Sequence, residues 1–390
     1  MALTIGLLAG EASGDNLGAG LMAQLQAQYR ESDPAASIRF VGVGGPRMQA
    51  AGLQTLASMD ELAVNGFREP LLRLPQLLRL LRRLIREFTV AEVDAFVGVD
   101  FNVFNFLLEA ALKKRAIRTV HYVSPSVYAW RSGRTRRVAK CADLLLCLYP
   151  FEPDFYAGLP VHAEFIGHPL ADEIDPQAGS DEARAAARQG LGVSATHTVM
   201  ALLPGSRTSE VSLMIEPFLG AAEIFADQHA PVEVVIPCLR PHIRELVERA
   251  VAQHPALAVT LYDGNARQAL VAADVALVKS GTSTLEAMLL HRPMVVSYRL
   301  GALSYQLAKR VVRTPHVALP NILAGETLVP ELIQDAATGP ALASALSEQL
   351  ESTRNDSTVI NAFKGLHERL RQGADTKAAA AVLRLLRNQL

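Results

Sequence analysis

The sequence predicts an α/β protein built from two doubly wound parallel sheets. Three observations support this prediction. The chain has 390 residues, which is long for one hydrophobic core and favours two domains. Uninterrupted apolar runs of strand length, typical of parallel strands buried on both faces, alternate with amphipathic helical segments. These βα units form two series, separated by a polar, turn-rich stretch.

The expected domain boundaries follow this alternation. The predicted division has an N-terminal domain over 1–172, a linker over 173–190, a second domain over 191–340 and a helical segment over 341–390. The last segment shows amphipathic spacing. We expect it to pack back on the N-terminal domain or on a partner chain, so a homodimer is left open.

The first series supplies the strands of the N-terminal domain. Its apolar runs are Leu3–Ala9, Ile38–Val43, Ala95–Val99, 119–123 and 144–148. A glycine-bearing turn from Gly10 to Asp15 follows the first run, but it lacks the GxGxxG spacing of a dinucleotide site. Ligands of such sheets lie beyond the carboxyl ends of the strands. Asp100 and His121 are both expected at that edge.

The stretch 67–88 predicts a long helix with an unusual surface. Leucines at helical spacing form a stripe wider than a normal core face, and arginines occupy the opposite arc. This pattern suits a helix that lies on an anionic membrane. The alternative is a core helix with a solvated basic face. Pro75 is expected in its first turn, where it would not break the helix.

The second series carries two similar strand-to-helix corners. Apolar runs at 199–203, 232–237, 257–261, 275–278 and 294–297 predict its strands. Arg207 follows the turn after the first of these runs, and Glu286 lies one turn into the helix after the fourth. Helix N-termini and a guanidinium bind phosphate, and a carboxylate suits ribose hydroxyls. The two corners favour a nucleotide-sugar site, whereas ordinary capped corners are the alternative.

The bulk composition excludes several classes of protein. Half of the residues are hydrophobic, a fifth are charged, and the net charge of −1 argues against a general nucleic-acid binder. Three cysteines without a CxxC pair favour free thiols in a reducing cytoplasm. The first residues are expected to form a strand rather than a signal peptide, because no basic region precedes the apolar run. No apolar run is long enough to predict a membrane-spanning helix.

Eight specific motifs are spread over nearly the whole chain. They are AGEASGD at 9–15, VGVGGPRM at 41–48, VHYVSPSVYAW at 120–130, FIGHPLAD at 165–172, LLPGSRTSEV at 202–211, SGTSTLE at 280–286, MVVSYR at 294–299 and LPNILAG at 319–325. With these motifs the sequence resembles the lipid-A-disaccharide synthase family, glycosyltransferase family 19. The resemblance implies a GT-B fold, two Rossmann-like domains facing each other across a cleft, with the donor nucleotide on the C-terminal one.

The resemblance also implies an inverting hexosyltransferase of lipid A biosynthesis. Its partners would be UDP-2,3-diacylglucosamine as donor, 2,3-diacylglucosamine 1-phosphate as acceptor and the inner-membrane lipid surface. Its products would be a β-1,6 disaccharide 1-phosphate and UDP. No cofactor and no metal are implied, and the Cys and His residues are scattered. Because both substrates are acylated, we expect a cytoplasmic protein attached peripherally to the inner membrane.

Inversion needs a base for the acceptor hydroxyl and positive groups for the leaving diphosphate. Asp100 is expected to be the base, with His121 and His168 as second choices; a helix cap is the alternative role for Asp100. Arg207 is expected at the diphosphate and Glu286 at the ribose. The other residues expected on the donor side, some carried over from the family's motifs, are Ser206, Ser280, Gly281, Thr282, Arg299 and Asn321.

Two further groups of residues complete the expected surfaces. Glu11, Ser13 and Asp15 are expected on the acceptor side. The membrane-docking set on the 67–88 helix consists of Leu71, Leu74, Leu78, Leu81, Arg79, Arg82, Arg83 and Arg86.

The chain departs from the family pattern in three places. Asn102 and Val103 stand where the family has a Pro and a second Asp, so that Asp has no catalytic role here. Tyr128 replaces a Trp, and 63–71 differs from the usual segment. These departures lie on the acceptor side and leave the donor motifs intact.

Three rival functions are carried with this prediction. A UDP-sugar 2-epimerase on the same architecture would turn over its nucleotide-sugar without an acceptor. A non-catalytic nucleotide-sugar or lipid-binding homologue would keep Arg207 and Glu286 but would not need Asp100. A glycosyltransferase with an undecaprenyl-linked acceptor is disfavoured only by the resemblance.

Overall fold

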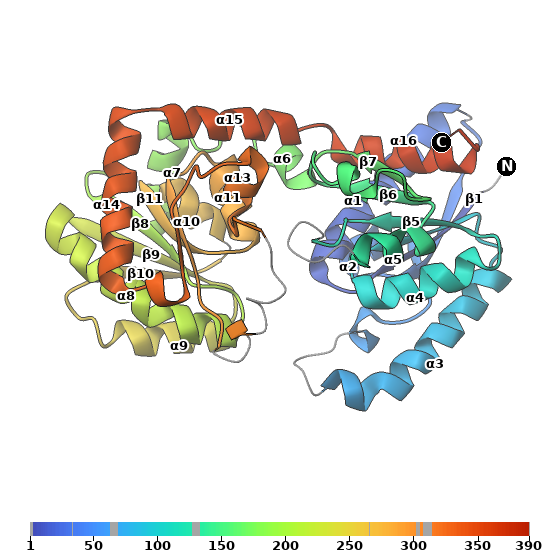
Figure 1. Cartoon of the computed structure of the whole chain (residues 1–390), viewed down its shortest axis with the longest axis horizontal. Helices are drawn as coiled ribbons and strands as arrows, with labels where there is room; N and C mark the ends of the chain where they lie inside the picture. The colour runs from blue at the N-terminus through green and yellow to red at the C-terminus, as the bar shows by residue number, and fades with distance from the viewer. Residues whose placement is uncertain are drawn as a thin grey trace. The chain divides into compact units, whose positions relative to one another are not determined.

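The computed structural model describes residues 3–32, 34–62, 69–126, 133–264, 266–301, 305–306 and 314–389. The chain divides into two compact units, Met1–Asp172 with Leu370–Leu390, and Glu173–Arg369. Figure 1 labels the helices and strands of each unit along the chain. Each unit contains one parallel sheet, in agreement with the predicted fold class.

The sheet of the first unit has seven strands within the described residues, in the order β3-β2-β1-β4-β5-β6-β7. Every pairing in it is parallel. The strands are β1 (Leu3–Ala9), β2 (Ile38–Val43), β3 (Leu53–Thr55), β4 (Ala95–Val99), β5 (Arg118–Tyr122), β6 (Leu144–Cys147) and β7 (His162–Phe165).

Two core layers cover the faces of this sheet. Leu7 of β1 belongs to the cluster that includes residues of α1 (Ala12–Ser32) and α16 (Ala374–Leu386). Its neighbour Leu8 belongs to the cluster that includes residues of α3 (Glu69–Val90) and α4 (Asn102–Lys113). Successive side chains of a strand point to opposite faces, so an apolar run such as β1 requires helices on both.

The second unit has, in its described part, a six-stranded sheet in the order β10-β9-β8-β11-β12-β13. The strand that comes first in the sequence, β8, lies in the middle of the sheet beside β11, so the ends of β8 and β11 are side by side. The strands are β8 (Thr198–Leu203), β9 (Val232–Cys238), β10 (Ala258–Asp263), β11 (Val275–Lys279), β12 (Met294–Tyr298) and β13 (Glu331–Ile333).

The remaining α-helices connect these strands or follow them. They are α2 (Pro46–Ala50), α5 (Gly133–Cys141), α6 (Pro169–Glu173), α7 (Asp181–Leu191), α8 (Thr208–His229), α9 (Pro241–Val251), α10 (Ala266–Ala272), α11 (Thr282–Leu289), α13 (Leu319–Ala324), α14 (Gly339–Asn355) and α15 (Thr358–Leu370).

Two expected boundaries differ from the structure. The segment 173–190 is not an open linker, because it contains most of α7, whose buried Arg188 belongs to the second unit. The segment 341–390 does not pack as one piece, because α14 contacts α8 in the second unit whereas α16 contacts α1 in the first. Both segments carry amphipathic patterns. Such a pattern shows that one face of a helix is buried but does not identify the surface against which it packs.

The long helix α3 begins at Glu69, so Pro75 lies inside it rather than in its first turn. Its buried side, formed by Leu80, Leu84 and Phe88, packs in the core of the first unit. The helix is therefore both a core element and, as described below, a surface element.

Candidate active site

A pocket of about 490 Å³ lies at the carboxyl ends of β8, β9 and β11 in the second unit. Its volume falls in the range of roughly 300–1,000 Å³ typical of small-ligand sites. The pocket brings together five of the residues expected at the donor nucleotide, namely Ser206, Arg207, Gly281, Thr282 and Glu286.

Two helix starts face this pocket. Arg207 is the N-cap of α8 and Gly281 the N-cap of α11, and neither helix has a side-chain cap. Their first N–H groups are thus free to bind an anion. The turn before α8 requires glycine, since Gly205 has a φ of +128° and a Cβ there would lie 2.8 Å from the Cβ of Glu210.

Lys279 and Glu210 also line the pocket, although the sequence reasoning gave neither a role. The Lys279 Nζ lies 3.1 Å from Glu210 Oε1, and Arg207 Nη1 lies 3.2 Å from the same oxygen. Burial raises the pKa of Glu210, but Lys279, the Ser206 N–H and Arg207 outweigh it and lower that pKa. One carboxylate therefore holds two cations at the pocket, and the two separate segments of sequence that supply them do not reveal this pattern.

Glu286 supplies the second carboxylate of the pocket. Burial raises the pKa of Glu286, and Glu173 adds to this effect while Arg267 opposes it. An ionised carboxylate accepts strong hydrogen bonds from two ribose hydroxyls, whereas the protonated group keeps one neutral acceptor oxygen, so protonation of Glu286 weakens this interaction.

Three residues expected on the donor side do not line this pocket. The Ser280 hydroxyl donates to the Val317 carbonyl at 2.8 Å. Arg299 donates to the carbonyls of Gln334 and Ala337. Asn321 is fully buried, and its amide bonds the backbone of 328–329 and the Glu331 carboxylate. These contacts support the walls of the site, and the side chains are already occupied.

In the first unit, Asp100 directly follows β4 at the carboxyl edge of the sheet. Asp100 and Phe101 both have left-handed backbone, with φ of +49° and +48°. Such a conformation is costly for residues other than glycine and is concentrated at functional sites. The Asn105 amide supports the turn by donating to the Asp100 carbonyl at 2.7 Å.

A chain of hydrogen bonds leads from Asp100 into the core of the first unit. The side-chain Nδ2 of Asn102 donates to Asp100 Oδ1 at 3.2 Å, and the side-chain Oδ1 of Asn102 lies 3.2 Å from His121 Nε2. His121 Nδ1 lies 2.7 Å from Glu109 Oε1. Both His121 and Glu109 have no exposed surface. His121 therefore reaches Asp100 only through Asn102, and it does not meet solvent as a base would.

The direction of these bonds follows from donor and acceptor chemistry. The Asn102 amide must donate to a carboxylate, so its oxygen accepts from His121 Nε2–H. Burial raises the pKa of Glu109, against the lowering effects of His121 and Lys113. Glu109 Oε1 and His121 Nδ1, 2.7 Å apart, are joined by one hydrogen bond, while Nε2–H of His121 points at Asn102. Gly98 makes room for this pair, because a Cβ there would lie 2.3 Å from Glu109 Oε1.

The residues expected on the acceptor side have different surroundings. Glu11 and Ser13 are exposed at the start of α1. Asp15 is buried, and its two oxygens accept from the N–H groups of Arg47 and Met48 at the start of α2. Asp15 thus caps a helix. The second-choice base His168 accepts from the Leu170 N–H, and burial lowers the pKa of His168 to about 4.

The outer surface of α3 combines leucines with arginines. Leu74 and Leu78 are 48% and 39% exposed. Leu81, in contrast, packs against the core, and the side chain of Leu71 lies outside the described residues. A hollow of about 980 Å³ is lined by all four arginines of the expected docking set, Arg79, Arg82, Arg83 and Arg86, and also by the carboxylates Asp60 and Glu61.

One family departure is part of the hydrogen-bonded chain, because Asn102, which stands where the family has Pro, links Asp100 to His121. Val103 is 75% exposed on α4, so the missing carboxylate leaves no gap in the core. Tyr128 and residues 63–68 lie outside the described residues.

Within the described residues, no group of three or more His, Cys, Asp or Glu side chains could hold a metal ion. None of the helices described is long and apolar enough to cross a membrane.

Comparison with known proteins places this geometry in a family. The family model described as Lipid-A-disaccharide synthetase matches residues 5–382. Lipid-A-disaccharide synthase of Sodalis glossinidius is 48% identical over 387 residues, covering 98% of each chain. Its counterpart in Pseudomonas aeruginosa is 46% identical over 384 residues, again covering 98% of each chain.

Solved structures show the same fold at low sequence identity. MurG of Acinetobacter baumannii is 14% identical with a TM-score of 0.56, covering 99% of each chain. The UDP-GlcNAc 2-epimerase of Neisseria meningitidis bound to UDP-GlcNAc is 11% identical with a TM-score of 0.60 and the same coverage. The fold is that of GT-B glycosyltransferases, and by its family match and its relatives the chain belongs to the lipid-A-disaccharide synthase family, the hexosyltransferases of lipid A biosynthesis.

Proposed function

We propose that the protein transfers 2,3-diacylglucosamine from UDP to the 6-hydroxyl of 2,3-diacylglucosamine 1-phosphate. The acceptor oxygen forms a bond to the anomeric carbon as the bond from that carbon to the diphosphate oxygen breaks. The electron pair of the broken bond leaves with UDP, and the hydroxyl proton goes to Asp100. The observation that carries this proposal is the donor pocket with two cations and a carboxylate in a member of this family.

On the donor side, Arg207 and Lys279 neutralise the diphosphate. Both cations are held by Glu210, so they are oriented before the nucleotide arrives. The N–H groups at the starts of α8 and α11, with Ser206, Gly281 and Thr282, complete the anion site. Glu286 accepts hydrogen bonds from the ribose. Ser280, Arg299 and Asn321 act by holding the surrounding segments.

On the acceptor side, Asp100 is the general base. The hydrogen-bonded chain from Glu109 through His121 and Asn102 holds its carboxylate by a single N–H bond. His121 and Glu109 are therefore positioning residues. Glu11 and Ser13, exposed at the start of α1, are available to acceptor hydroxyls.

The acylated substrates bring the protein to a lipid surface. We place Leu74 and Leu78 in the interface of the inner membrane and the α3 arginines against anionic head groups. The protein is then a cytoplasmic, peripherally attached enzyme.

An assay of UDP release tests the reaction. Purified protein is given UDP-2,3-diacylglucosamine with and without 2,3-diacylglucosamine 1-phosphate. We expect acceptor-dependent release, and we expect Asp100→Asn to lower kcat by about 10²–10⁴-fold because a general base is lost. UDP affinity should be unchanged, since Asp100 is not part of the donor pocket. Release without acceptor would indicate an epimerase or hydrolase, and wild-type activity in Asp100→Asn would exclude Asp100 as the base.

A further inference from the structure

A second pocket of the second unit lies at the opposite edge of the same sheet. Its volume is about 380 Å³, and Asp274 and Pro293, which line it, directly precede β11 and β12. The donor pocket, in contrast, is lined by residues after the strands. Four cationic side chains line this second pocket, namely Arg184, Arg292, Arg354 and Lys364, and Asp274 is the one carboxylate in its described lining.

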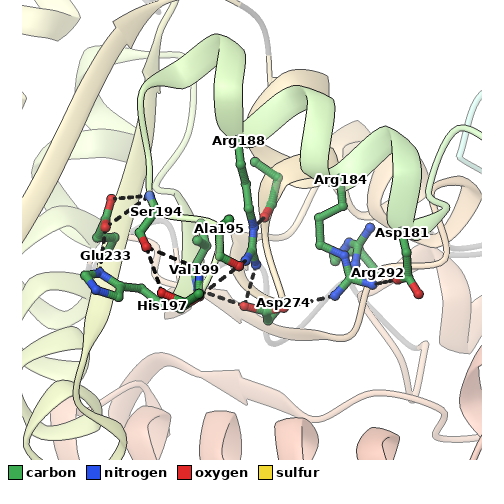
Figure 2. Close-up of polar contacts among 12 residues, drawn as sticks. Asp181, Arg184, Arg188, Ser194, Ala195, His197, Val199, Glu233, Asp274 and Arg292 are labelled. Atoms are coloured by element: carbon green, nitrogen blue, oxygen red, sulfur yellow. Dashed lines mark hydrogen bonds and ion pairs between the residues drawn. The ribbon is translucent and has the colours of Figure 1, made fainter.

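Asp274, which lines this pocket, is surrounded by a cluster of arginines, of which Arg184 and Arg292 also line the pocket. Figure 2 shows Arg184 and Arg188 reaching Asp274 from α7, with nitrogen–oxygen distances of 3.0 Å and 2.7 Å. Arg184 also pairs with the exposed Asp181. Two carboxylates thus face three arginines once Arg292 is included, and the cluster keeps an excess of positive charge.

The three arginines differ in how completely they are bonded. Arg188 donates through Nε and both terminal nitrogens to three carbonyls and to Asp274, which is a structural role. Arg292 is only 4% exposed and forms no ion pair with any described residue. Its Nη2 donates weakly to the carbonyls of Gly179 and Val271, and its Nε has no partner. A buried guanidinium with an unpaired donor is destabilising, and a bound anion would supply the missing hydrogen-bond acceptor and the opposite charge.

The mouth of the pocket adds to the positive field. Arg354 on α14 and Lys364 on α15 are exposed, and neither forms an ion pair within the described part of the chain. Burial lowers the pKa of the pocket residue His291 to about 4, and the charges of His367, Lys364 and Arg292 lower it further in the same direction. The neighbourhood therefore disfavours another positive charge and favours a negative one.

We propose that this pocket is a second anion site, which binds the phosphate group of a soluble phosphorylated compound away from the donor pocket. Arg292 at the base and Arg354 and Lys364 at the mouth would surround the phosphate, with Arg184 at its side. Guanidinium groups suit this ligand because they donate two parallel hydrogen bonds to phosphate oxygens. The excess charge that the fold keeps at this place would then be neutralised.

The test is calorimetric titration of the full-length protein with inorganic phosphate, at an ionic strength held constant with chloride. We expect binding that weakens at least about tenfold when Arg354→Glu and Lys364→Glu are combined, since charge-assisted hydrogen bonds are lost. Arg292 is left unchanged because of its burial. Arg249→Glu, on an exposed turn of α9 in the same unit, is the matched control and should leave binding unchanged.

One background variant and one spectroscopic signal separate this pocket from the donor pocket, which can also bind phosphate. Arg207→Ala weakens the donor pocket, and in this background phosphate should still bind and its binding should still depend on Arg354 and Lys364. Phosphate should also raise the pKa of His291, measured by NMR of its imidazole. Absence of phosphate binding in the Arg207→Ala background, equal binding with and without the Arg354→Glu/Lys364→Glu changes, or no binding beyond that of chloride would each overturn the proposal.

Discussion

At the residue scale, the position of Asp100 depends on side chains that lie behind it. Its carboxylate receives one side-chain hydrogen bond from Asn102, which in turn receives one from the buried His121. The backbone of Asp100 and Phe101 is left-handed. The position of the Asp100 carboxylate is therefore fixed by a strained turn and by the side-chain amide of Asn102. This arrangement makes Asn102 the most informative residue to change around the base.

Replacing Asn102 by Ala should lower kcat by about tenfold and leave UDP affinity unchanged. Val103→Ala, at an exposed neighbouring position, is the control and should change neither quantity. Wild-type kcat in Asn102→Ala would show that Asp100 does not depend on this hydrogen bond.

Glu286 makes UDP binding depend on pH. Burial raises the pKa of Glu286 above its ordinary value of 4.5, so the carboxyl group gains its proton at a higher pH than an exposed Glu does. Affinity for UDP should therefore fall as the pH drops toward that raised pKa. Calorimetry should show about tenfold weaker binding in Glu286→Gln and the loss of this part of the pH dependence. Glu245→Gln on α9 is the control, and the same pH dependence in Glu286→Gln would contradict the assignment.

At the scale of elements, the leucines of α3 divide between two roles, packing in the core and forming an exposed surface. Its leucine stripe divides into buried members, such as Leu80 and Leu84, and exposed members, Leu74 and Leu78. Leu81 belongs to the core contacts of the helix. Changing the whole expected docking set would therefore damage the fold as well as the surface, and a narrower pair of substitutions is required.

Leu74→Ser combined with Leu78→Ser should weaken binding to vesicles containing phosphatidylglycerol by at least about tenfold, since two leucine side chains leave the apolar phase. Cosedimentation measures the bound fraction, and circular dichroism checks that the fold is retained. The matched control is Leu107→Ser on α4, which is 52% exposed on the same unit. Equal vesicle binding by the double variant and the wild type would exclude α3 as the docking element.

At the scale of the whole molecule, the end of the chain completes the unit formed by its beginning. Buried residues of α16, among them Val382 and Leu385, belong to the same cluster as Leu7 of β1. Leu346 of α14 belongs instead to the core of the second unit. Figure 1 shows α16 beside α1, in agreement with their contacts.

Substitutions in these two helices should destabilise different units. Leu385→Ala should lower the stability of the first unit by about 2–5 kcal/mol, because a cavity opens in its core. Leu346→Ala should do the same to the second unit. Hydrogen exchange followed by mass spectrometry should show lost protection in β1 and β4 for the first variant and in β8 and β11 for the second. Lost protection confined to the second unit in Leu385→Ala would contradict the assignment of α16.

The sequence by itself determined the fold class and the composition of the donor corners. Apolar runs identify buried parallel strands because both faces of such strands must be apolar. Arg207 and Glu286 could be recognised because each follows a strand at a corner whose chemistry is local. The motifs also identified the family, since they retain the residues around those corners.

Only the tertiary structure decided which distant residues meet. Lys279, at the end of β11, and Glu210, in the first turn of α8, are 69 positions apart and form an ion pair. Glu109 reaches His121 from a helix that packs on the sheet. The structure likewise separated Asn321 and Arg299 from the pocket, assigned α16 to the first unit and gathered the arginines around Asp274. Hydrophobic periodicity states that a face is buried but not what covers it, and a polar residue does not carry the identity of its partner. The partners are determined only when the elements pack, because an unpaired polar or charged group raises the free energy of the fold only once it is buried.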